Sequence, residues 1–352
     1  MRSLSVDQNG KLSIVEVSMP VWNDCQALVR TLSCGVCSGT DMKLIHRTFK
    51  NFDSYPALLG HEAVGRVVET GKNVTKYRPG DLVLLPFIYG EHNGYHSGWG
   101  GYSEYTVVGD EQAFARAGKG IETPDYDEGC YAQTIIKPQD RVNPVNAAMI
   151  ITFREVLSAI RRFGMRENES VVIYGDGPVG MCFTRFAKLL GLDPVILIGK
   201  HDDKINQAKN LGADIVINHF KEDAVAVIRD KFPDGIDNIV DAVGINTLIN
   251  QAMKLVKHNG KICGYGISAE LNMQLDWSDA PYNWSLNFVQ WPSKKEEMLA
   301  HSQIMAWINS GLLNPDDFIS HVYPFEEIIS AFTRIDQKQE NTKKVIIKYR
   351  ED

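Results

Sequence analysis

The sequence of 352 residues is informative first for what it lacks. No apolar run approaches the length of a membrane span, and Met1 to Gln8 include no apolar block of the signal-peptide type. There is no run of basic residues, and the net charge of -7 is spread along the chain, which argues against nucleic acid as the main partner. We therefore expect a freely diffusing cytoplasmic protein, with neither a membrane nor a nucleic acid as partner.

Cysteine is also scarce. Six cysteines in so long a chain are too few and too scattered for a disulfide framework, so we expect reduced thiols. Cys34 and Cys37 form a C-x-x-C pair, which a redox dithiol would use. This pair does not open a helix in a thioredoxin-like pattern, so the redox interpretation is the less favoured one.

The most organised stretch is an apolar run that ends in a glycine turn. A strand is expected over 170–174 and an apolar helix over 181–190, and between them lies Gly175-Asp176-Gly177-Pro178-Val179-Gly180. This order is typical of a dinucleotide site: Gly175 permits the tight turn, Gly177 lets phosphate approach the backbone, and Gly180 lets the helix pack on the strand. The helix N-terminus offers N–H groups to the pyrophosphate. Asp176 must then point away from that anion.

Short apolar segments alternate with helical ones after this turn, which predicts a parallel, doubly wound sheet. The segments lie at 194–198, 204–211, 215–218, 224–232, 236–241, 248–256 and 261–267. In the N-terminal third, 11–20 and 27–32 alternate apolar and polar residues as strands do. The length and the hydrophobic content of 44% allow two cores, so we expect an α/β chain of two domains.

The end of the strand after the glycine turn discriminates between the two dinucleotides. An acidic residue is expected there if the adenosine ribose has a free 2′-hydroxyl, because a carboxylate accepts its hydrogen bond. The strand ends instead in Gly199-Lys200-His201. Lys200 could neutralise a 2′-phosphate and His201 could donate to it, so NADP(H) is favoured over NAD(H). In the alternative, Lys200 points to solvent and Asp202 or Asp203 contacts the ribose.

A thiol, an imidazole and a carboxylate occur close together in the β-rich part, at Cys37, His61 and Glu62. Thiolate and imidazole suit Zn²⁺, and a carboxylate can complete three protein ligands while water keeps a fourth position, as in catalytic sites. Taken alone, His61 would be a structural histidine and Glu62 a solvated surface charge.

Several motifs together resemble, in order and spacing, the medium-chain zinc-dependent alcohol and polyol dehydrogenases. They are Gly35-Val36-Cys37 with Thr40-Asp41, Gly60-His61-Glu62 with Gly65, Arg78-Pro79-Gly80-Asp81-Leu82-Val83, and Gly100-Gly101-Tyr102-Ser103-Glu104-Tyr105. The resemblance runs nearly end to end. It implies a GroES-like catalytic domain over 1–148 and 287–352, and a Rossmann domain over 149–286.

The resemblance also implies residue roles. Cys37 and His61 would bind catalytic zinc, and Glu62 would bind it directly, as in the sorbitol-type enzymes, or lie just outside the ligands. Thr40 would begin a proton relay from the substrate alcohol. The loops that hold Val243 and Gly266 resemble those near the adenine and nicotinamide rings.

The sequence departs from the family pattern near the first ligand. Two residues, Ser38 and Gly39, separate Cys37 from Thr40 where the family usually has one. The relay histidine of many relatives is replaced by Lys43. His46 lies one helical turn farther on and is either a substitute or a surface residue.

Further departures concern the metals. The interval 87–99 has no cysteine, so no structural zinc is predicted, and His92 and His96 flank a turn that is a poor metal site. The segment 149–152 lacks the cysteine or glutamate with which many relatives complete the catalytic site. Either Glu155 takes that role, or Cys37, His61, Glu62 and water suffice; we favour the second.

Two regions receive no chemistry. The chain from 110 to 143 looks irregular, with Gly118, Pro124, Asp125 and Asp127, and is interpreted as a surface excursion or an oligomer contact. Trp277, Trp284 and Trp291 are expected to bury apolar area or to form an oligomer surface rather than a substrate pocket.

The favoured function is hydride transfer between NADP(H) and an alcohol, polyol or sugar, or the matching carbonyl, with one catalytic zinc, in a homodimer or homotetramer. Two alternatives remain open. One is a zinc-free enone or quinone reductase of the same fold, and the other is a nucleotide-binding protein without catalytic activity.

Overall fold

The structure is a computed structural model, and it describes residues 1–120 and 128–351. The chain divides into two compact units, residues 1–154 with 293–352 and residues 155–292. The domain limits expected from the sequence, after 148 and after 286, stay predictions. The first division falls inside one long helix, α3 (Met149–Phe163).

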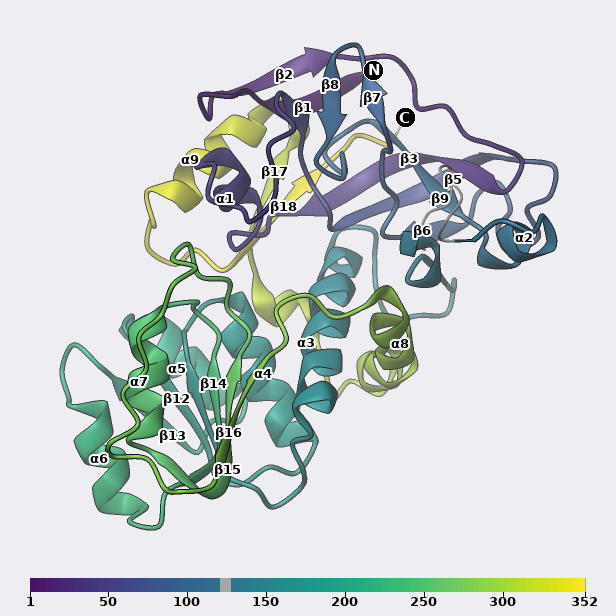
Figure 1. The fold of residues 1–352 in the computed structure, drawn as a ribbon. Helices are drawn as coiled ribbons and strands as arrows, with labels where there is room; N and C mark the ends of the chain where they lie inside the picture. The colour runs from purple at the N-terminus through teal and green to yellow at the C-terminus, as the bar shows by residue number, and fades with distance from the viewer. Residues whose placement is uncertain (121–127, 352) are drawn as a thin grey trace. The chain divides into compact units, whose positions relative to one another are not determined.

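The first unit is built mainly of strands. Its described elements are β1 (Arg2–Val6), β2 (Leu12–Glu16), β3 (Gln26–Gly35), α1 (Asp41–Ile45), β4 (Ala57–Leu58), β5 (Ala63–Thr70), β6 (Leu82–Leu84), β7 (Glu91–His92), β8 (Tyr95–Ser97), β9 (Tyr105–Gly109), α2 (Glu111–Arg116), η1 (Glu128–Tyr131), β10 (Thr134–Ile136), η2 (Asn146–Ala148), α8 (Lys294–Asn309), η3 (Pro315–Phe318), β17 (Ile319–Pro324), η4 (Phe325–Glu327), α9 (Ile328–Asp336) and β18 (Lys344–Lys348). Figure 1 shows these strands gathered in two sheets.

The sheet that matters for the site has the order β10-β6-β5-β3-β18-β17, with β9 also paired to β3. The C-terminal strand β18 runs antiparallel to β3, with Ile347 opposite Cys34 and Ile346 opposite Gly35. The smaller sheet has the order β2-β1-β4-β8-β7. Residues from the first and last parts of the chain therefore meet where β3 ends.

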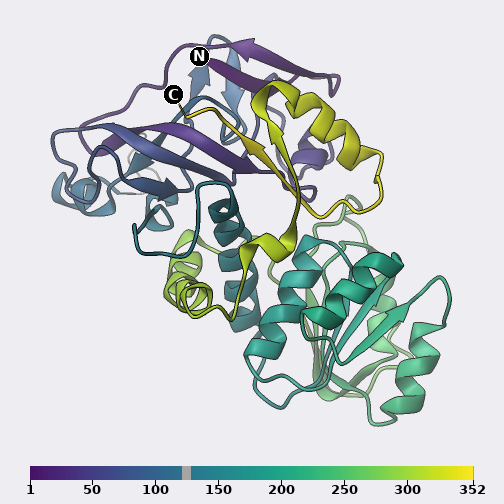
Figure 2. The same cartoon turned by 180° about the vertical axis from the view of Figure 1, so that it is seen from behind.

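A buried core joins these elements. It combines side chains of β1, β3, β18 and α9, among them Leu4, Cys34, Val345 and Phe332. Figure 2 shows α9 beside β17 and β18 from the opposite side. The hydrophobic effect therefore holds the C-terminal segment on the N-terminal sheet.

The second unit is a doubly wound sheet, as predicted. Its described elements are β11 (Val171–Tyr174), α4 (Pro178–Leu189), β12 (Val195–Gly199), α5 (Asp202–Asn210), β13 (Ile215–Asn218), α6 (Ala224–Lys231), β14 (Ile236–Asp241), α7 (Asn246–Met253), β15 (Val256–Gly264) and β16 (Trp284–Phe288). All pairs of the order β13-β12-β11-β14-β15-β16 are parallel. Helices α4 and α5 cover one face and α6 and α7 the other (Figures 1 and 2).

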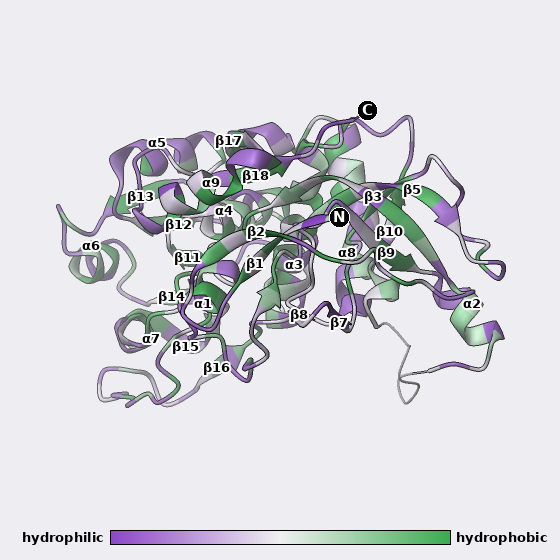
Figure 3. Cartoon of the chain, turned by 90° about the horizontal axis from the view of Figure 1, so that it is seen from above, coloured by the Kyte–Doolittle hydropathy of each residue, from purple (hydrophilic) through white to green (hydrophobic). Residues whose placement is uncertain are grey.

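Hydropathy follows this layering. The β11 and β12 strands are buried along their whole length and carry hydrophobic residues, while α5 exposes mostly hydrophilic ones (Figure 3). A strand covered on both faces is expected to be a continuous apolar run, which is what the sequence has there. Among the described residues, no helix is long and apolar enough to span a bilayer.

The expectation of an irregular chain from 110 to 143 was wrong for its described part. Asp110 caps helix α2 by accepting from the backbone N–H groups of Gln112 and Ala113. The β10 strand pairs with β6. The short helix depends on a cap and the short strand on a distant partner, so neither has a long periodic pattern. Pro124, Asp125 and Asp127 lie outside the described residues.

The tryptophans of the second unit have different surroundings. Trp284 begins β16 and packs on the core of the parallel sheet, whereas Trp277 and Trp291 are exposed. The β16 strand forms one edge of that sheet and also exposes Phe288.

Candidate functional site

A tight turn follows β3 and takes up the extra residue found in the sequence. The carbonyl oxygen of Cys37 accepts from the backbone N–H groups of Thr40 and Asp41, at 3.2 and 2.8 Å. The Asp41 carboxylate in turn accepts from the N–H of Cys37 at 3.1 Å. Ser38 and Gly39 lie inside this closed turn, so Thr40 stays near Cys37 despite the insertion.

A fully buried carboxylate, Asp41, organises the next contacts. Its Oδ2 accepts from the hydroxyl of Tyr102 at 2.7 Å, and its Oδ1 lies 3.5 Å from Nδ1 of His61. Burial by itself lowers the pKa of His61, but the nearby Asp41 carboxylate and Cys37 thiol outweigh it and raise that pKa well above its usual range. A carboxylate on one ring nitrogen fixes the ring and leaves the other nitrogen for a metal.

Glu62 is held by a buried cation from the far end of the chain. Its Oε1 accepts from Nζ of Lys344 at 2.6 Å and from the hydroxyl of Thr152 at 3.1 Å. Lys344 also forms an ion pair with Oε2, and both side chains are at most 4% exposed. Gly35 leaves room for this pair, because a Cβ there would lie 3.0 Å from Lys344 and closer still to Glu62.

Cys37, His61 and Glu62 come together in space. One ligand atom of each lies within 4.8 Å of the others. His61 and Glu62 are buried and Cys37 is half-buried. Sulfur, imidazole nitrogen and carboxylate oxygen are the donors that zinc takes in proteins, and the contact to Asp41 is the outer support expected of a ligating histidine. The three residues therefore fit a zinc ion in kind and in spacing.

The relay candidates differ in their surroundings. The Thr40 side chain is buried, and its hydroxyl makes no hydrogen bond with the described residues, so it can accept one from a substrate. Lys43 donates from Nζ to the carbonyl oxygen of Gly39 at 3.0 Å, and burial lowers its pKa. His46 instead pairs with Asp336 at 3.2 Å.

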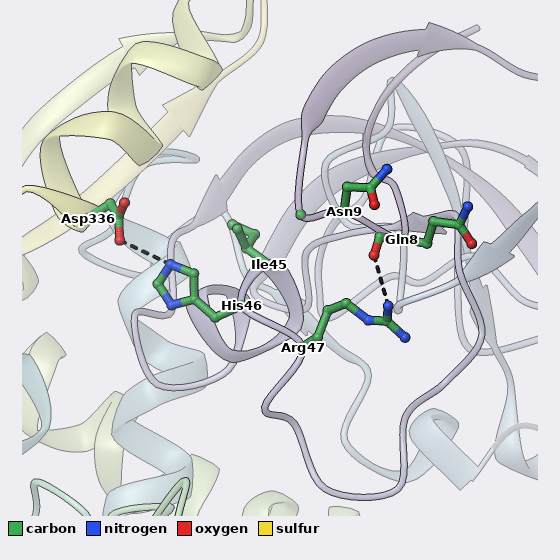
Figure 4. A pocket seen from close by; sticks show the side chains of 7 residues that line it. Gln8, Asn9, Ile45, His46, Arg47 and Asp336 are labelled. Atoms are coloured by element: carbon green, nitrogen blue, oxygen red, sulfur yellow. Dashed lines mark hydrogen bonds and ion pairs between the residues drawn. The ribbon is translucent and has the colours of Figure 1, made fainter.

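Figure 4 shows where His46 lies. It lines a cavity of about 440 Å³ together with Gln8, Asn9, Gly10, Ile45, Arg47 and Asp336. Arg47 donates to the carbonyl oxygen of Gln8 at 2.9 Å. None of the three metal candidates lines this cavity, so the surface interpretation of His46 agrees with its contacts.

The other metal candidates have contacts of their own. The Nε2 of His92 lies 3.0 Å from the carbonyl oxygen of Tyr89, and His96 belongs to β8. In the segment where relatives carry a further ligand, Thr152 contacts Glu62. Glu155 belongs to the second unit. Within residues 1–120 and 128–351, Cys37, His61 and Glu62 are the group with metal-site spacing.

The C-x-x-C pair is not arranged as a redox dithiol. Cys34 is fully buried, and burial raises the pKa of its thiol well above the usual range. A reactive thiol needs a lowered pKa and some exposure. Among the described residues, no two cysteines are joined in a disulfide.

The glycine turn of the second unit has the predicted backbone geometry. Gly175 has a φ of 122°, which favours glycine. A Cβ on Gly180 would lie 1.9 Å from the carbonyl oxygen of Gly175, so the helix and strand approach as only glycine allows. A Cβ on Gly177 would meet nothing within 4 Å, which leaves open space where α4 begins with Pro178 and Val179. This cradle fits a pyrophosphate.

The remaining nucleotide candidates lie at the same edge of the sheet. Val243 follows β14, and its side chain is 3.0 Å from where a Gly175 Cβ would be. A Cβ on Gly266 would lie 2.1 Å from the backbone nitrogen of Gly244, so the loops after β14 and β15 touch. Asp241, whose pKa is raised by burial, fixes this turn by accepting from the N–H groups of Val243 and Gly244. Ligands of such sheets bind at these carboxyl ends.

Asp176 points toward the end of β12. Its Oδ2 accepts from the backbone N–H groups of Lys200 and His201, both at 2.8 Å, and lies 2.9 Å from Nδ1 of His201. The carboxylate is thus directed away from the pyrophosphate cradle, as the sequence requires. Gly199, Lys200 and His201 all lie around it.

Comparison with known proteins finds two family models along the chain. Residues 23–147 match the family model of the alcohol dehydrogenase GroES-like domain, and residues 178–288 match that of zinc-binding dehydrogenases. An alcohol dehydrogenase of Geobacillus stearothermophilus is 33% identical over 261 residues, which cover 73% of this chain and 74% of that protein. The chain belongs to the medium-chain zinc-dependent alcohol and polyol dehydrogenases.

Other members of this dehydrogenase family match over more of the chain. A D-arabitol-phosphate dehydrogenase of Enterococcus avium is 25% identical over 92% of this chain and 91% of its own. The crystal structure of galactitol-1-phosphate dehydrogenase from Escherichia coli superposes with a TM-score of 0.77 at 19% identity, covering 99% of both chains. The second likeness shows the fold. The predicted family, the GroES-like fold and the Rossmann fold are thereby confirmed.

Sequence reasoning missed three contributors to the sites of this dehydrogenase. Lys344 received no role from the sequence, and Thr152 was noted only as part of a segment that lacks a further metal ligand. Asp176 was expected only to point away from the pyrophosphate, and its contacts with Lys200 and His201 were not predicted. A lysine at the start of the apolar run 344–347 could have been a signal, because a buried lysine needs a charged partner.

Proposed function

We propose that this dehydrogenase transfers a hydride between a nicotinamide dinucleotide and an alcohol, polyol or sugar, with zinc held by Cys37, His61 and Glu62. The observation that carries the proposal is the convergence of these three donors within 4.8 Å. When bound, zinc supplies a Lewis acid that polarises the substrate oxygen. The nicotinamide, when bound, supplies the hydride acceptor or donor.

The residues around the three ligands have positioning roles in this proposal. Asp41 sets the ring of His61 through the 3.5 Å contact to Nδ1. Lys344 and Thr152 hold the carboxylate of Glu62. A ligand that its neighbours hold in place keeps its geometry during turnover, which preserves the alignment of substrate and cofactor.

Thr40 moves the proton in this proposal. Its hydroxyl is not engaged by the described residues, and the turn from Cys37 to Asp41 keeps it beside the first ligand. It accepts the proton of the substrate alcohol while its own proton passes outward. Lys43 stands at the position of the relay histidine, and its ammonium donates to the carbonyl oxygen of Gly39 within the same turn.

The dinucleotide would lie at Gly175, Gly177 and Gly180, with Val243 and Gly266 nearby. The open space beside Gly177 and the free N-terminus of α4 support this placement. The preference for NADP(H), drawn from Gly199-Lys200-His201, stays a prediction. The carboxylate of Asp176 lies among those same residues and supports the opposite preference.

Substitution of the glycines separates packing from binding. Gly180→Ala should lower the free energy of unfolding by about 1–3 kcal/mol, because its Cβ would press on the carbonyl oxygen of Gly175. Gly177→Ala should leave stability nearly unchanged, since its Cβ meets nothing within 4 Å, yet weaken dinucleotide binding by filling the cradle. Chemical denaturation and dinucleotide titration of both variants provide the measurement. Equal dinucleotide affinity in Gly177→Ala and the unchanged protein would contradict the proposed cradle.

The substrate class is best tested by a panel of alcohols, polyols, sugars and their carbonyl partners, followed by nicotinamide absorbance. The polar site with Glu62 favours polyols or sugars, so these should give a higher kcat/KM than simple apolar alcohols of the same length. Simple primary alcohols serve as the matched comparison. A preference for enones or quinones, with no turnover of any alcohol, would point to the reductase alternative instead.

Assembly and location remain predictions from the sequence. The edge strand β16 and the exposed Phe288 and Trp291 support a homodimer or homotetramer, because an apolar sheet edge is a natural surface for a second copy. The expected location is the cytoplasm.

A further inference from the structure

The carboxylate of Asp176 lies near the end of the second strand, where a Rossmann domain usually contacts the adenosine ribose. Asp176 lies in the glycine turn between β11 and α4, but its side chain extends to the end of the neighbouring strand β12. The residue is only 8% exposed. The end of the second strand is where the acidic residue of the dinucleotide fingerprint is expected, and this chain has none there.

The absence of a side chain at Gly199 leaves the space that the side chain of Asp176 occupies. A Cβ at Gly199 would lie 2.7 Å from Cβ of Asp176 and 2.9 Å from its Oδ2, which is closer than side chains pack. No side chain can therefore be accommodated at 199 while Asp176 keeps its position. The acidic group that usually comes from the end of the second strand comes here from the first turn.

One carboxylate oxygen of Asp176 has no hydrogen bond with the described residues, whereas both oxygens of the nearby Asp202 have partners. Oδ2 of Asp176 accepts all three hydrogen bonds from Lys200 and His201, and Oδ1 makes none with the described residues. Asp202, by contrast, accepts from Asn218 at 2.7 Å and pairs with Lys221 at 2.6 Å. Oδ1 of Asp176 is thus the free acceptor for a ribose hydroxyl.

We propose that Asp176 binds the 2′-hydroxyl of the adenosine ribose and makes this dehydrogenase prefer NAD(H) to NADP(H), an inference that rests on the proposed dinucleotide site. It reverses the preference that Gly199-Lys200-His201 suggested in the sequence. Those residues place no acidic side chain at the ribose, but the folded chain brings one there.

Two effects act against a 2′-phosphate at this place. The phosphate would bring a charge of about −2 beside the carboxylate. Asp176 stays ionised at neutral pH, since hydrogen bonds from Lys200 and His201 outweigh the effect of burial and lower its pKa. The backbone N–H groups that could have bound phosphate oxygens already donate to Oδ2. The positive groups that act on Asp176, His201 and Lys204, help to keep its carboxylate charged.

The test is a pair of binding titrations, NADH and NADPH, followed by protein fluorescence and needing no turnover. The intact protein should bind NADH roughly 100-fold more tightly than NADPH, as a like-charge contact of several kcal/mol implies. Asp176→Asn should reduce that ratio at least about tenfold, mainly by tighter NADPH binding. Asp202→Asn removes a neighbouring carboxylate that is already engaged and should leave the ratio unchanged.

Asp176→Ala serves as a second variant should the asparagine variant fail to fold, and the ratio in the unchanged protein is decisive without either. Tighter binding of NADPH by the unchanged protein would overturn the inference while leaving the dinucleotide site standing. An unchanged ratio in Asp176→Asn would do the same. If neither dinucleotide binds, the inference and the proposed function both fail.

Discussion

Replacing Cys37 with alanine is expected to remove the bound zinc and to lower kcat about a thousandfold or more. Cys37 is the thiol of the three-donor group, and an imidazole and a carboxylate alone are a poor site for zinc. Loss of Lewis-acid stabilisation worth several kcal/mol corresponds to a rate loss of that size. Turnover and metal content, measured on the same preparation, should fall together, and His61→Ala should behave alike.

Cys34→Ala is the matched control. Cys34 belongs to the same C-x-x-C pair but is fully buried in the core, and its sulfur contacts the carbonyl oxygen of Gly35. This variant should lose about 1 kcal/mol of stability through the small cavity and retain both zinc and turnover. If Cys37→Ala keeps its activity without metal, the zinc mechanism is wrong.

Lys344→Ala should lower the free energy of unfolding by about 3 to 5 kcal/mol, because it leaves the carboxylate of Glu62 buried without its cation. The thermodynamic cost comes from removing one partner of a desolvated pair rather than from the strength of the pair. Urea denaturation in the presence of a chelator measures it, so that no metal compensates for the missing charge.

Two comparisons make this result specific. Lys343→Ala removes the neighbouring lysine side chain, whose ammonium donates to the carbonyl oxygen of Asp317, and should cost less than about 1 kcal/mol. The double variant Glu62→Gln with Lys344→Met removes both charges and should recover most of the lost stability. A loss below about 1 kcal/mol for Lys344→Ala alone would show that Glu62 has another partner for its charge.

Much of the fold could be predicted because its signals are local. The strand, glycine turn and helix at 171–189 follow one another without a break, and the helices and strands from 195 to 241 lie close to where their apolar patterns put them. Strand β15 begins at 256 rather than at 261, and β16 was not predicted. Helix α2 and strand β10 were not predicted. Each is short, and its stability depends on a cap or on a paired strand rather than on periodicity.

The site was predictable only as far as sequence neighbours determine it. Cys37, His61 and Glu62 lie within a short span and meet in space. Lys344 lies 282 residues from Glu62 and reaches it because β18 pairs with β3. That pairing depends on the packed core of the first unit, so the residues near Glu62 in the sequence do not predict its contact with Lys344.

Asp176 illustrates the same limit with a different consequence. Its partners are 24 and 25 residues away, just past the end of the next strand, β12. In the sequence alone, Gly199 indicates that no carboxylate is present at the ribose. In the folded chain, Gly199 is the space that a carboxylate occupies. The two interpretations predict opposite cofactors.

Zinc analysis of the purified, intact protein tests the central claim most directly. We expect one zinc per chain, with chelation removing zinc and turnover together while the dinucleotide still binds. A metal-free protein that turns over substrate would support the zinc-free reductase, and one that binds the dinucleotide without any turnover would support a non-catalytic binding protein. Either result would contradict a zinc centre at Cys37, His61 and Glu62.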